Sequence, residues 1–555
     1  MKEKLALLII IFLAIVLRFY KFGETPPSLY WDEAAIGYNA YSILKTGADE
    51  YGEKFPVAFR SFDDYKPPLY IYLTVPSVAV FGLTEAAVRF PSAVAGVLMV
   101  VIGYLLVKTF FENDIRRGRL AAIAVAFSLA VSPWAIHVSR VAFEANLCAL
   151  LIMAAVYFFL KSVRASPFYF ILSILFFILS LYAYHSARLF VPFLIIVLGF
   201  IYRRELFKIK KTVVLAFLLG AILATPMAIT FFSPKTQGRV ITMSVFSYLQ
   251  TPEYWQSVAR EENESVSSPA FKAFHNQAFD FLKTITWHYF NHFSGRYLFL
   301  NGDYNERLAD FQSGNFYIWQ LPFMLIGLFW LIAKNPDRRI TVLLLSWLML
   351  APLPSALSRD KENLLRALNF LPALTIIIGF GLWQAVEWLR KKPMIWKFLL
   401  VFPYFLFSIF YFLFYLDSYY LHTPTKWSSF WQYGYKEVVE FVEPLKSKYE
   451  NIYVSTDYGQ PYIYFLFYQK YPPKNYQPQA SLAKKAVYDV GEGTGYDNFS
   501  FRKLYWPDGR SLKKSLFIGP PEQLPLRDIR EDQAKLIKTF YFKNGLEAFR
   551  IVETF

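Results

Sequence analysis

Eleven long apolar runs are the feature that most constrains this 555-residue chain. A helix that crosses a bilayer needs about 20 mostly apolar residues, and each run meets this within a few residues. Because lipid cannot satisfy exposed backbone groups, such runs fold as helices. We therefore predict an all-α polytopic membrane protein. The runs lie at 4–22, 88–110, 119–136, 144–161, 168–185, 188–203, 212–232, 316–334, 340–356, 367–389 and 395–417.

The charge pattern orients these runs. Only 18% of the residues are charged, and the formal net charge is +16. In a soluble protein this charge would suggest nucleic acid as a partner. Here the basic residues form short clusters between apolar runs, and with the N-terminus inside nearly all of them fall in inner loops, as cytoplasmic loops require. We expect no nucleic-acid partner, a multi-pass plasma-membrane protein, a cytoplasmic N-terminus and an extracytoplasmic C-terminal region.

Two apolar segments need separate treatment. The run 4–22 resembles a signal peptide, but no small-x-small cleavage site follows it, so we expect an uncleaved first span. The segment 69–83 is shorter and contains a proline. Counting it as a span would move nearly every basic cluster outside, so it is predicted to be juxtamembrane or re-entrant.

The soluble parts are predicted to lie on the outer side. We divide the chain into a membrane domain, 1–417, with outer loops at 23–87 and 233–315, and a small α/β domain, 418–555. The single cysteine, Cys148, permits no intramolecular disulfide. Within the second domain the patterns predict an amphipathic helix at 433–448, buried strands at 451–455 and 515–519, and a hairpin at 534–551.

The first outer loop contains the acidic pair Asp32-Glu33 at the start of a predicted helix. One interpretation is structural: Asp32 caps the helix and Glu33 complements its dipole. The other is functional, because a carboxylate at the membrane surface can remove a proton from an acceptor hydroxyl. Adjacent helix residues point about 100° apart, so the two acids are expected to have different roles.

The same loop ends with Asp63-Asp64-Tyr65-Lys66-Pro67-Pro68. This segment reads either as a proline-stiffened turn with a snorkelling lysine or as a frame that holds Lys66 against a lipid phosphate. A lysine ammonium suits a phosphate as a point charge.

These motifs together resemble a family. Trp31-Asp32-Glu33-Ala34 after the first span, Lys66-Pro67-Pro68-Leu69, and Val88-Arg89-Phe90-Pro91-Ser92 opening the second span are similar, in order and spacing, to the phospholipid-carrier-dependent glycosyltransferases. This superfamily has the GT-C fold and includes protein O-mannosyltransferases and lipid A aminoarabinose transferases. The resemblance is strongest over 25–110, and the C-terminal region lies outside it.

The resemblance implies roles for four residues. Asp32, with Glu33 beside it, would act at the catalytic centre, and Lys66 would contact the carrier phosphate. Arg89 would face the same site, with an interfacial anchor as the alternative.

Further polar residues at the outer ends of the spans are candidates to line the site, because ionisable groups at membrane depth are functional candidates by default. Snorkelling at the interface is the alternative. The predicted phosphate contacts in this group are Arg140, Arg188 and Arg366. The predicted substrate contacts are Asp63, Asp64, Tyr65, Glu144 and His185, although His185 also reads as a hydrogen-bonded interface residue.

The sequence contains no recognisable metal motif. His288 and His292 are four residues apart but lack the glutamate of a zincin motif. A divalent cation near Asp32 and Glu33 is the one cofactor the resemblance leaves open.

The predicted function is transfer of a hexose or pentose from a polyprenyl-phosphate carrier to a protein, lipid or polysaccharide acceptor on the outer face. A single displacement would invert the anomeric centre, either without a metal or with carboxylate-metal assistance. Two alternatives remain: a lipid-linked-sugar flippase or transporter, and an oligosaccharide ligase.

Overall fold

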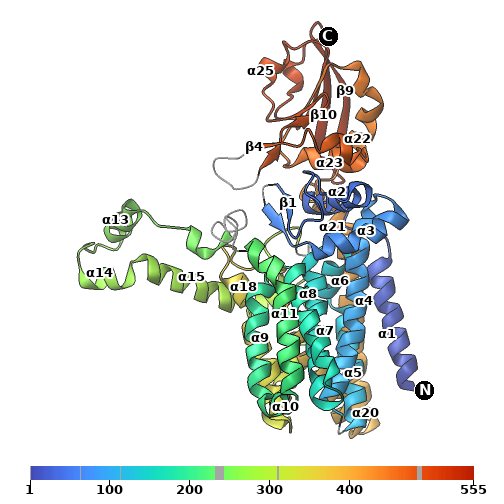
Figure 1. Cartoon of the computed structure of the whole chain (residues 1–555), viewed down its shortest axis with the longest axis vertical. Helices are drawn as coiled ribbons and strands as arrows, with labels where there is room; N and C mark the ends of the chain where they lie inside the picture. The colour runs from blue at the N-terminus through green and yellow to red at the C-terminus, as the bar shows by residue number, and fades with distance from the viewer. Residues whose placement is uncertain (1, 63, 113, 232–242, 309–311, 484–490) are drawn as a thin grey trace.

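The computed structural model describes residues 2–62, 64–112, 114–231, 243–308, 312–483 and 491–555. Figure 1 shows a bundle of long, roughly parallel helices with an α/β domain stacked on one end. The first outer loop lies between the bundle and this domain, and an arm of shorter helices projects sideways near the same level.

Each predicted apolar run contains a helix. Among the described residues, six helices are long and apolar enough to cross a membrane, or seven if one bent pair counts as a single span. The chain is therefore a multi-pass membrane protein, while the count of eleven stays a prediction because several helices are shorter. The helices are α1 (Lys2–Phe19), α4 (Glu85–Phe110), α5 (Ile115–Val131), α7 (Glu144–Arg164), α8 (Phe168–Ala183), α9 (Ala187–Ile201), α11 (Lys210–Phe231), α16 (Leu321–Phe329), α17 (Arg338–Leu350), α19 (Phe370–Arg390) and α20 (Met394–Asp417).

The predicted span 119–136 needs a correction, because it is not one straight helix. α5 ends at Val131, and α6 (Pro133–Arg140) continues at an angle of 55°. Pro133 lacks a backbone N–H and suits the first turn of a new helix, so the chain breaks at Ser132. All of α6 is buried at the outer end of the bundle.

The basic clusters gather at the end of the bundle away from the α/β domain. Glu3 pairs with Lys108 and Arg119, which joins the ends of α1, α4 and α5. The short α10 (Arg203–Lys208) lies at the same end, where Glu205 pairs with Arg339. This agrees with the predicted inner side, although the orientation in a membrane stays a prediction.

The first outer loop folds into α2 (Trp31–Thr46), β1 (Phe59–Ser61), β2 (Asp64–Lys66) and α3 (Leu69–Phe81). Almost the whole of α2 is buried between α3 and α4 on one side and the C-terminal domain on the other. Its small residues permit this close approach. A Cβ on Gly37 would lie 2.5 Å from Phe467 and 2.6 Å from Val88.

The C-terminal α/β domain confirms the predicted elements. Its six-stranded sheet has the order β6-β7-β3-β8-β10-β9. β3 pairs parallel with both β7 and β8, and the other pairs are antiparallel. The predicted strands are β3 (Asn451–Val454) and β8 (Ser515–Gly519), and the hairpin is β9 (Ala534–Tyr541) and β10 (Glu547–Thr554). The remaining strands are β4 (Leu482–Ala483), β5 (Glu492–Gly493), β6 (Gly495–Tyr496) and β7 (Phe499–Phe501).

Helices connect this sheet to the bundle. The helical run of α20 continues through a π-helical turn (Ser418–His422) into α21 (Thr423–Lys426). The predicted helix 433–448 is α22 (Tyr435–Val442) followed by a 3₁₀ turn (Glu443–Lys448). α23 (Pro461–Tyr468) and α24 (Pro473–Tyr476) contact α2, and α25 (Trp506–Gly509) precedes β8.

The second outer loop forms the projecting arm. It contains α13 (Pro252–Glu261), α14 (Pro269–Phe274) and α15 (Gln277–Asn291). α15 joins the bundle at the short α18 (Leu353–Ala356), which follows α17.

Candidate functional site

The first turn of α2 holds the acidic pair. Tyr30 has extended backbone angles and is the N-cap, so Asp32 is the second helical residue. The prediction that Asp32 caps the helix is therefore wrong, and its carboxylate is left for other contacts. The Trp31 N–H donates to Oε1 of Gln432, 3.1 Å away in the C-terminal domain.

Asp32 and Lys66 form an ion pair at the outer end of the bundle. The β1–β2 hairpin presents Lys66 opposite Phe59, and the ammonium also lies 5.6 Å from the centre of the Phe62 ring. The side chain of Lys66 is 8% exposed and that of Asp32 is 29% exposed. The lysine side of the pair is therefore enclosed by protein, whereas the carboxylate side is accessible.

Glu33 is buried and paired. Its side chain and that of Arg89 are both fully buried, and the Arg89 Nε donates to Glu33 Oε1 at 2.9 Å. The same oxygen accepts from the Ala142 N–H, and Oε2 accepts from Arg89 Nη2. The guanidinium of Arg89 also donates to the carbonyls of Phe22, Pro26 and Ser28. The geometry therefore does not support the predicted roles of Glu33 in catalysis and of Arg89 in phosphate binding.

Arg140 is also buried without access to the site. Its guanidinium donates to the carbonyls of Leu17, Arg18 and Thr25 and lies 4.7 Å from the Tyr420 ring. A cation at these carbonyls complements the negative end of α1. The structure thus places Arg140 as a helix-end contact, and the prediction of a phosphate contact is corrected.

Several other predicted residues do lie near the Asp32–Lys66 pair. The charges of Lys66 and Asp32 act on the carboxyl group of Glu144, which begins α7. His185, between α8 and α9, is surrounded by the charges of Arg188, Lys66 and Arg366.

His185 is half-buried among these cations and can share a hydrogen bond with a bound phosphate. Arg366 lies close enough for its charge to act on His185. Its guanidinium donates to Asp360 at 2.8 Å, and its side chain is 20% exposed.

The three predicted substrate contacts that precede Lys66 differ in what the structure shows. Asp63 lies outside the described residues. Asp64 and Tyr65 form β2 with Lys66, and the Asp64 carboxylate accepts from the Tyr65 N–H at 2.8 Å. This contact stabilises the hairpin that presents Lys66.

Arg307 is a site residue that the sequence did not indicate. Its guanidinium carbon lies 4.7 Å from the Trp31 ring centre and 5.3 Å from that of Tyr30. Its carbonyl accepts a hydrogen bond from His137 Nε2 at 2.9 Å, which fixes the backbone there. A lone arginine in a polar loop carries no signal in the sequence, and its aromatic partners are far away along the chain.

The donor set does not fit a divalent cation between Asp32 and Glu33. Both Glu33 oxygens accept hydrogen bonds from Arg89, and Asp32 is paired with Lys66. Across the part of the chain that the structure describes, no group of three or more His, Cys, Asp or Glu side chains is placed to hold a metal ion.

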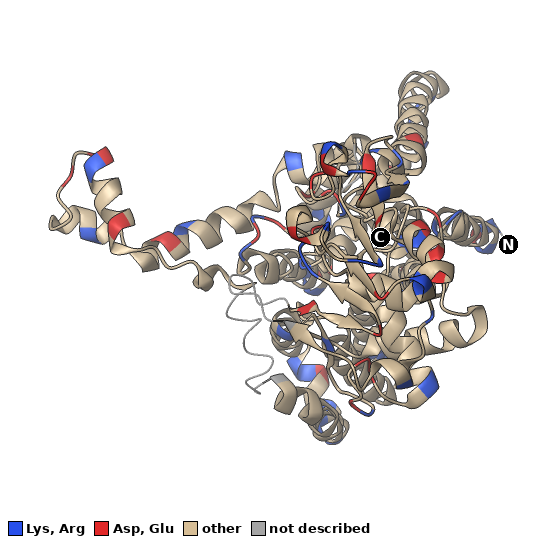
Figure 2. Cartoon of the chain, turned by 90° about the horizontal axis from the view of Figure 1, so that it is seen from above, with Lys and Arg blue, Asp and Glu red and all other residues tan. Residues whose placement is uncertain are grey.

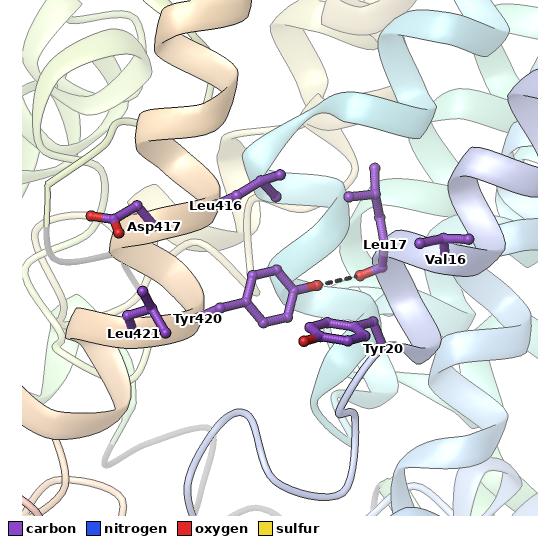
Figure 3. Close-up of a pocket in the computed structure, with 7 residues that line it drawn as sticks. All are labelled: Val16, Leu17, Tyr20, Leu416, Asp417, Tyr420 and Leu421. Carbon is purple, nitrogen blue, oxygen red and sulfur yellow. Dashed lines mark hydrogen bonds between the residues drawn. The ribbon is translucent and has the colours of Figure 1, made fainter.

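An apolar pocket of about 320 Å³ lies between α1 and α20. Figure 3 shows Tyr420 reaching across to the Leu17 carbonyl, with Tyr20 beside it. The other lining residues are Val16, Leu416, Asp417 and Leu421. This pocket is separate from the Asp32–Lys66 pair and opens among lipid-facing side chains.

Comparison with known proteins identifies the architecture. Residues 65–229 match the family model described as dolichyl-phosphate-mannose-protein mannosyltransferase. The fold is similar to that of ArnT from Cupriavidus metallidurans in the apo state, with 12% identity, a TM-score of 0.56, and coverage of 98% of this chain and 97% of that chain. The chain has the GT-C fold.

Two further comparisons concern this GT-C chain. The same ArnT bound to undecaprenyl phosphate gives 12% identity and a TM-score of 0.54, covering 99% of this chain and 96% of that chain. The oligosaccharyltransferase from Archaeoglobus fulgidus gives 15% identity and a TM-score of 0.49, covering 84% and 63%. No curated protein matches by sequence. The predicted resemblance is confirmed for the fold and for residues 65–229, a match that includes Lys66, Arg89 and His185 and begins after Asp32.

Proposed function

We propose that this GT-C chain transfers a single hexose or pentose from a polyprenyl-phosphate carrier to an acceptor hydroxyl on the outer face of the membrane. The contact between Asp32 and Lys66 carries the proposal. It puts a partly exposed carboxylate beside a cation at the level where a lipid phosphate lies. The ArnT structure with undecaprenyl phosphate shows a protein of the same fold with such a carrier.

The cationic side chains act on the leaving phosphate, and the Asp32 carboxylate acts on the attacking hydroxyl. Lys66 and Arg307 bind the carrier phosphate and stabilise its charge as it leaves. Arg307 lies against the rings of Trp31 and Tyr30, which hold its guanidinium next to the first turn of α2 that carries Asp32. When the phosphate draws Lys66 to itself, the Asp32 carboxylate becomes free to accept a proton.

The reaction is one displacement at the anomeric carbon. The acceptor oxygen forms a bond to that carbon while the bond to the phosphate oxygen breaks. The acceptor proton goes to Asp32, and the carrier leaves as polyprenyl phosphate. Attack from the face opposite the phosphate inverts the anomeric configuration.

The first test replaces Asp32. Asp32→Asn keeps the shape of the side chain and removes the base, so transfer of label from a panel of polyprenyl-phosphate sugars should fall by about 10²- to 10⁴-fold. The matched control is Asp532→Asn, an exposed aspartate of the C-terminal domain. Retained transfer in Asp32→Asn would remove the proposed base.

The same assay separates transfer from transport. Label that crosses the bilayer without forming a covalent product would favour the flippase alternative. The chemical nature of the labelled product distinguishes protein, lipid and polysaccharide acceptors.

A second test addresses Arg307. Arg307→Ala should raise the KM for the carrier-linked sugar about tenfold or more, because a charged contact to the phosphate is lost. Arg502→Ala is the control, since Arg502 lies 4.3 Å over the Tyr453 ring in the C-terminal domain. An unchanged KM in Arg307→Ala would place the phosphate elsewhere.

A further inference from the structure

The arm helix α15 exposes a face that does not suit water. Its outward side chains include Phe279, Leu282, Trp287 and Phe290, which are 39%, 61%, 63% and 63% exposed. Phe279, Leu282 and Phe290 lie on one side of the helix, in an exposed band that also holds Lys283 and Thr286. An amphipathic helix on a protein in water turns such a stripe toward the core.

The polar stripe of α15 faces the other way. Asp280, Thr284, His288 and Asn291 recur at spacings of three or four and are buried or half-buried. The first turn is tied to the preceding segment, where Gln277 donates to the Tyr248 carbonyl at 3.1 Å. Phe281, Ile285 and Tyr289 are half-buried as well, so apolar residues lie on both sides of α15, and its exposed side is unusually apolar for a helix in water.

The position of α15 accounts for its exposed apolar side chains. Figure 1 shows it running across the direction of the bundle helices, near their outer ends. The Tyr289 hydroxyl donates to the carbonyl of Met349 at 2.9 Å, close to the end of α17. A helix that leaves the bundle at this level runs through the headgroup region of a bilayer.

The acidic residues of the arm are concentrated on and after α13, where Arg260 is exposed as well. Lys272 and Lys283 are exposed on α14 and α15, where anionic headgroups would meet them. Glu253, Glu261 and Glu264 are exposed on and after α13, further from the bundle. Figure 2 shows this outer part of the arm carrying most of its acidic residues.

We propose that α15 is an interfacial membrane-binding helix whose partner is the outer lipid leaflet. Phe279, Leu282 and Phe290 enter the boundary between headgroups and acyl chains, Trp287 sits at headgroup depth, and α13 stays in water. The chain continues from α15 to the loop of Arg307, so the depth of α15 also sets the height of that loop. The contact does not depend on the proposed reaction.

The test places a fluorescent label on each side of the arm. Leu282→Cys and Phe290→Cys, each in the full chain, are labelled with an environment-sensitive dye and reconstituted in nanodiscs of phosphatidylcholine and phosphatidylglycerol. The native Cys148 is buried, and the unsubstituted chain gives the labelling background. Glu261→Cys in α13 is the matched control.

Lipids that carry a spin label near the headgroup should quench the dye at 282 and 290 at least twofold more than at 261. Equal and weak quenching at all three positions would overturn the proposal. A blue-shifted but unquenched dye at 282 and 290 would also overturn it, because the face would then be covered by a protein or a second copy. The two outward positions are independent, so one poorly folded variant leaves the other decisive.

Discussion

At the scale of single residues, buried arginines build the frame behind the site. Arg18, Arg89 and Arg140 are all at most 1% exposed, and together they donate to backbone carbonyls between residues 14 and 28 and at the end of α5. Of the three, Arg89 also pairs with a carboxylate, that of Glu33. They fix the segment that leads from α1 into the first turn of α2, and so they position Asp32 from behind.

Removing the partner of Arg89 should therefore affect stability. Glu33→Gln leaves a buried guanidinium without its counter-charge, which typically costs about 3–5 kcal/mol. Thermal unfolding in detergent should show a large fall in Tm, whereas Asp32→Asn should change Tm little because Asp32 is partly exposed.

The double variant Glu33→Leu with Arg89→Met provides the contrast. Replacing both charges with apolar groups should recover only part of the lost Tm. Neither charge is then buried alone, but the backbone groups that Arg89 and Glu33 satisfied lose their partners. If Glu33→Gln kept its Tm but lost transfer, Glu33 would regain the catalytic role that the sequence suggested.

The sequence could predict part of this site. Asp32 and Lys66 stood out because each lies in a short motif on a loop at a predicted membrane surface. The sequence predicted that Asp32 and Glu33 have different roles, but not that Glu33 is buried and Asp32 partly exposed. Which of the two is buried depends on how α4 and α6 pack against α2. Arg307 could not be found, since nothing local distinguishes a loop arginine that later packs on Tyr30 and Trp31.

At the scale of elements, α2 depends on small residues. Gly37→Ala would bring a Cβ to 2.5 Å from Phe467 and 2.6 Å from Val88, so α23 or α4 must move. Overpacking of this kind costs about 1–3 kcal/mol. We expect a lower Tm together with lower transfer, because the same shift disturbs the first turn.

Gly199→Ala in α9 is the matched control, because a Cβ there meets nothing within 4 Å. Alanine favours a helix over glycine by about 1 kcal/mol, so this variant should keep or raise Tm. Equal Tm values for the two variants would contradict the tight fit of α2.

The elements themselves were largely predictable. Apolar length gave the helices, and alternation with a Lys-Asn-Gly turn gave the β9–β10 hairpin, because these signals are local. The break between α5 and α6 had a local signal in Ser132-Pro133. The run 119–136 was predicted as one span because its mean hydropathy is high on both sides of this break. The exposed apolar side of α15 had no signal, because only the fold decides which side faces the protein.

At the scale of the whole molecule, the first outer loop is clamped under the C-terminal domain. Gln477 donates to the Asp49 carbonyl at 2.9 Å, and the hydroxyls of Tyr51 and Tyr462 are 3.3 Å apart. Glu50 is fully buried in this contact, and burial raises its pKa to about 8 from an ordinary 4.5. The carboxyl group is therefore protonated in the folded protein at neutral pH.

This burial makes stability depend on pH. Between pH 4.5 and about 8 the unfolded chain releases the Glu50 proton while the folded chain keeps it, so stability falls as pH rises through this window. Glu50→Gln should flatten the fall in Tm between pH 5 and 8. Glu53→Gln, an exposed neighbour, should leave the slope unchanged; a flattened slope there instead would assign the effect to general surface charge.

The Gln432 side chain has a consequence for how the protein is made. Its amide accepts from the Trp31 N–H and from the Tyr464 hydroxyl, and it donates to the Tyr458 carbonyl. The helix that begins at Trp31 thus waits for a partner 401 residues later in the chain. At about 5–20 residues per second, a ribosome takes roughly 20–80 s to supply it. During that interval the membrane helices and Asp32 are already synthesised, but the start of α2 lacks its contact with Gln432. The proposed sugar transfer would therefore begin only when synthesis is nearly finished.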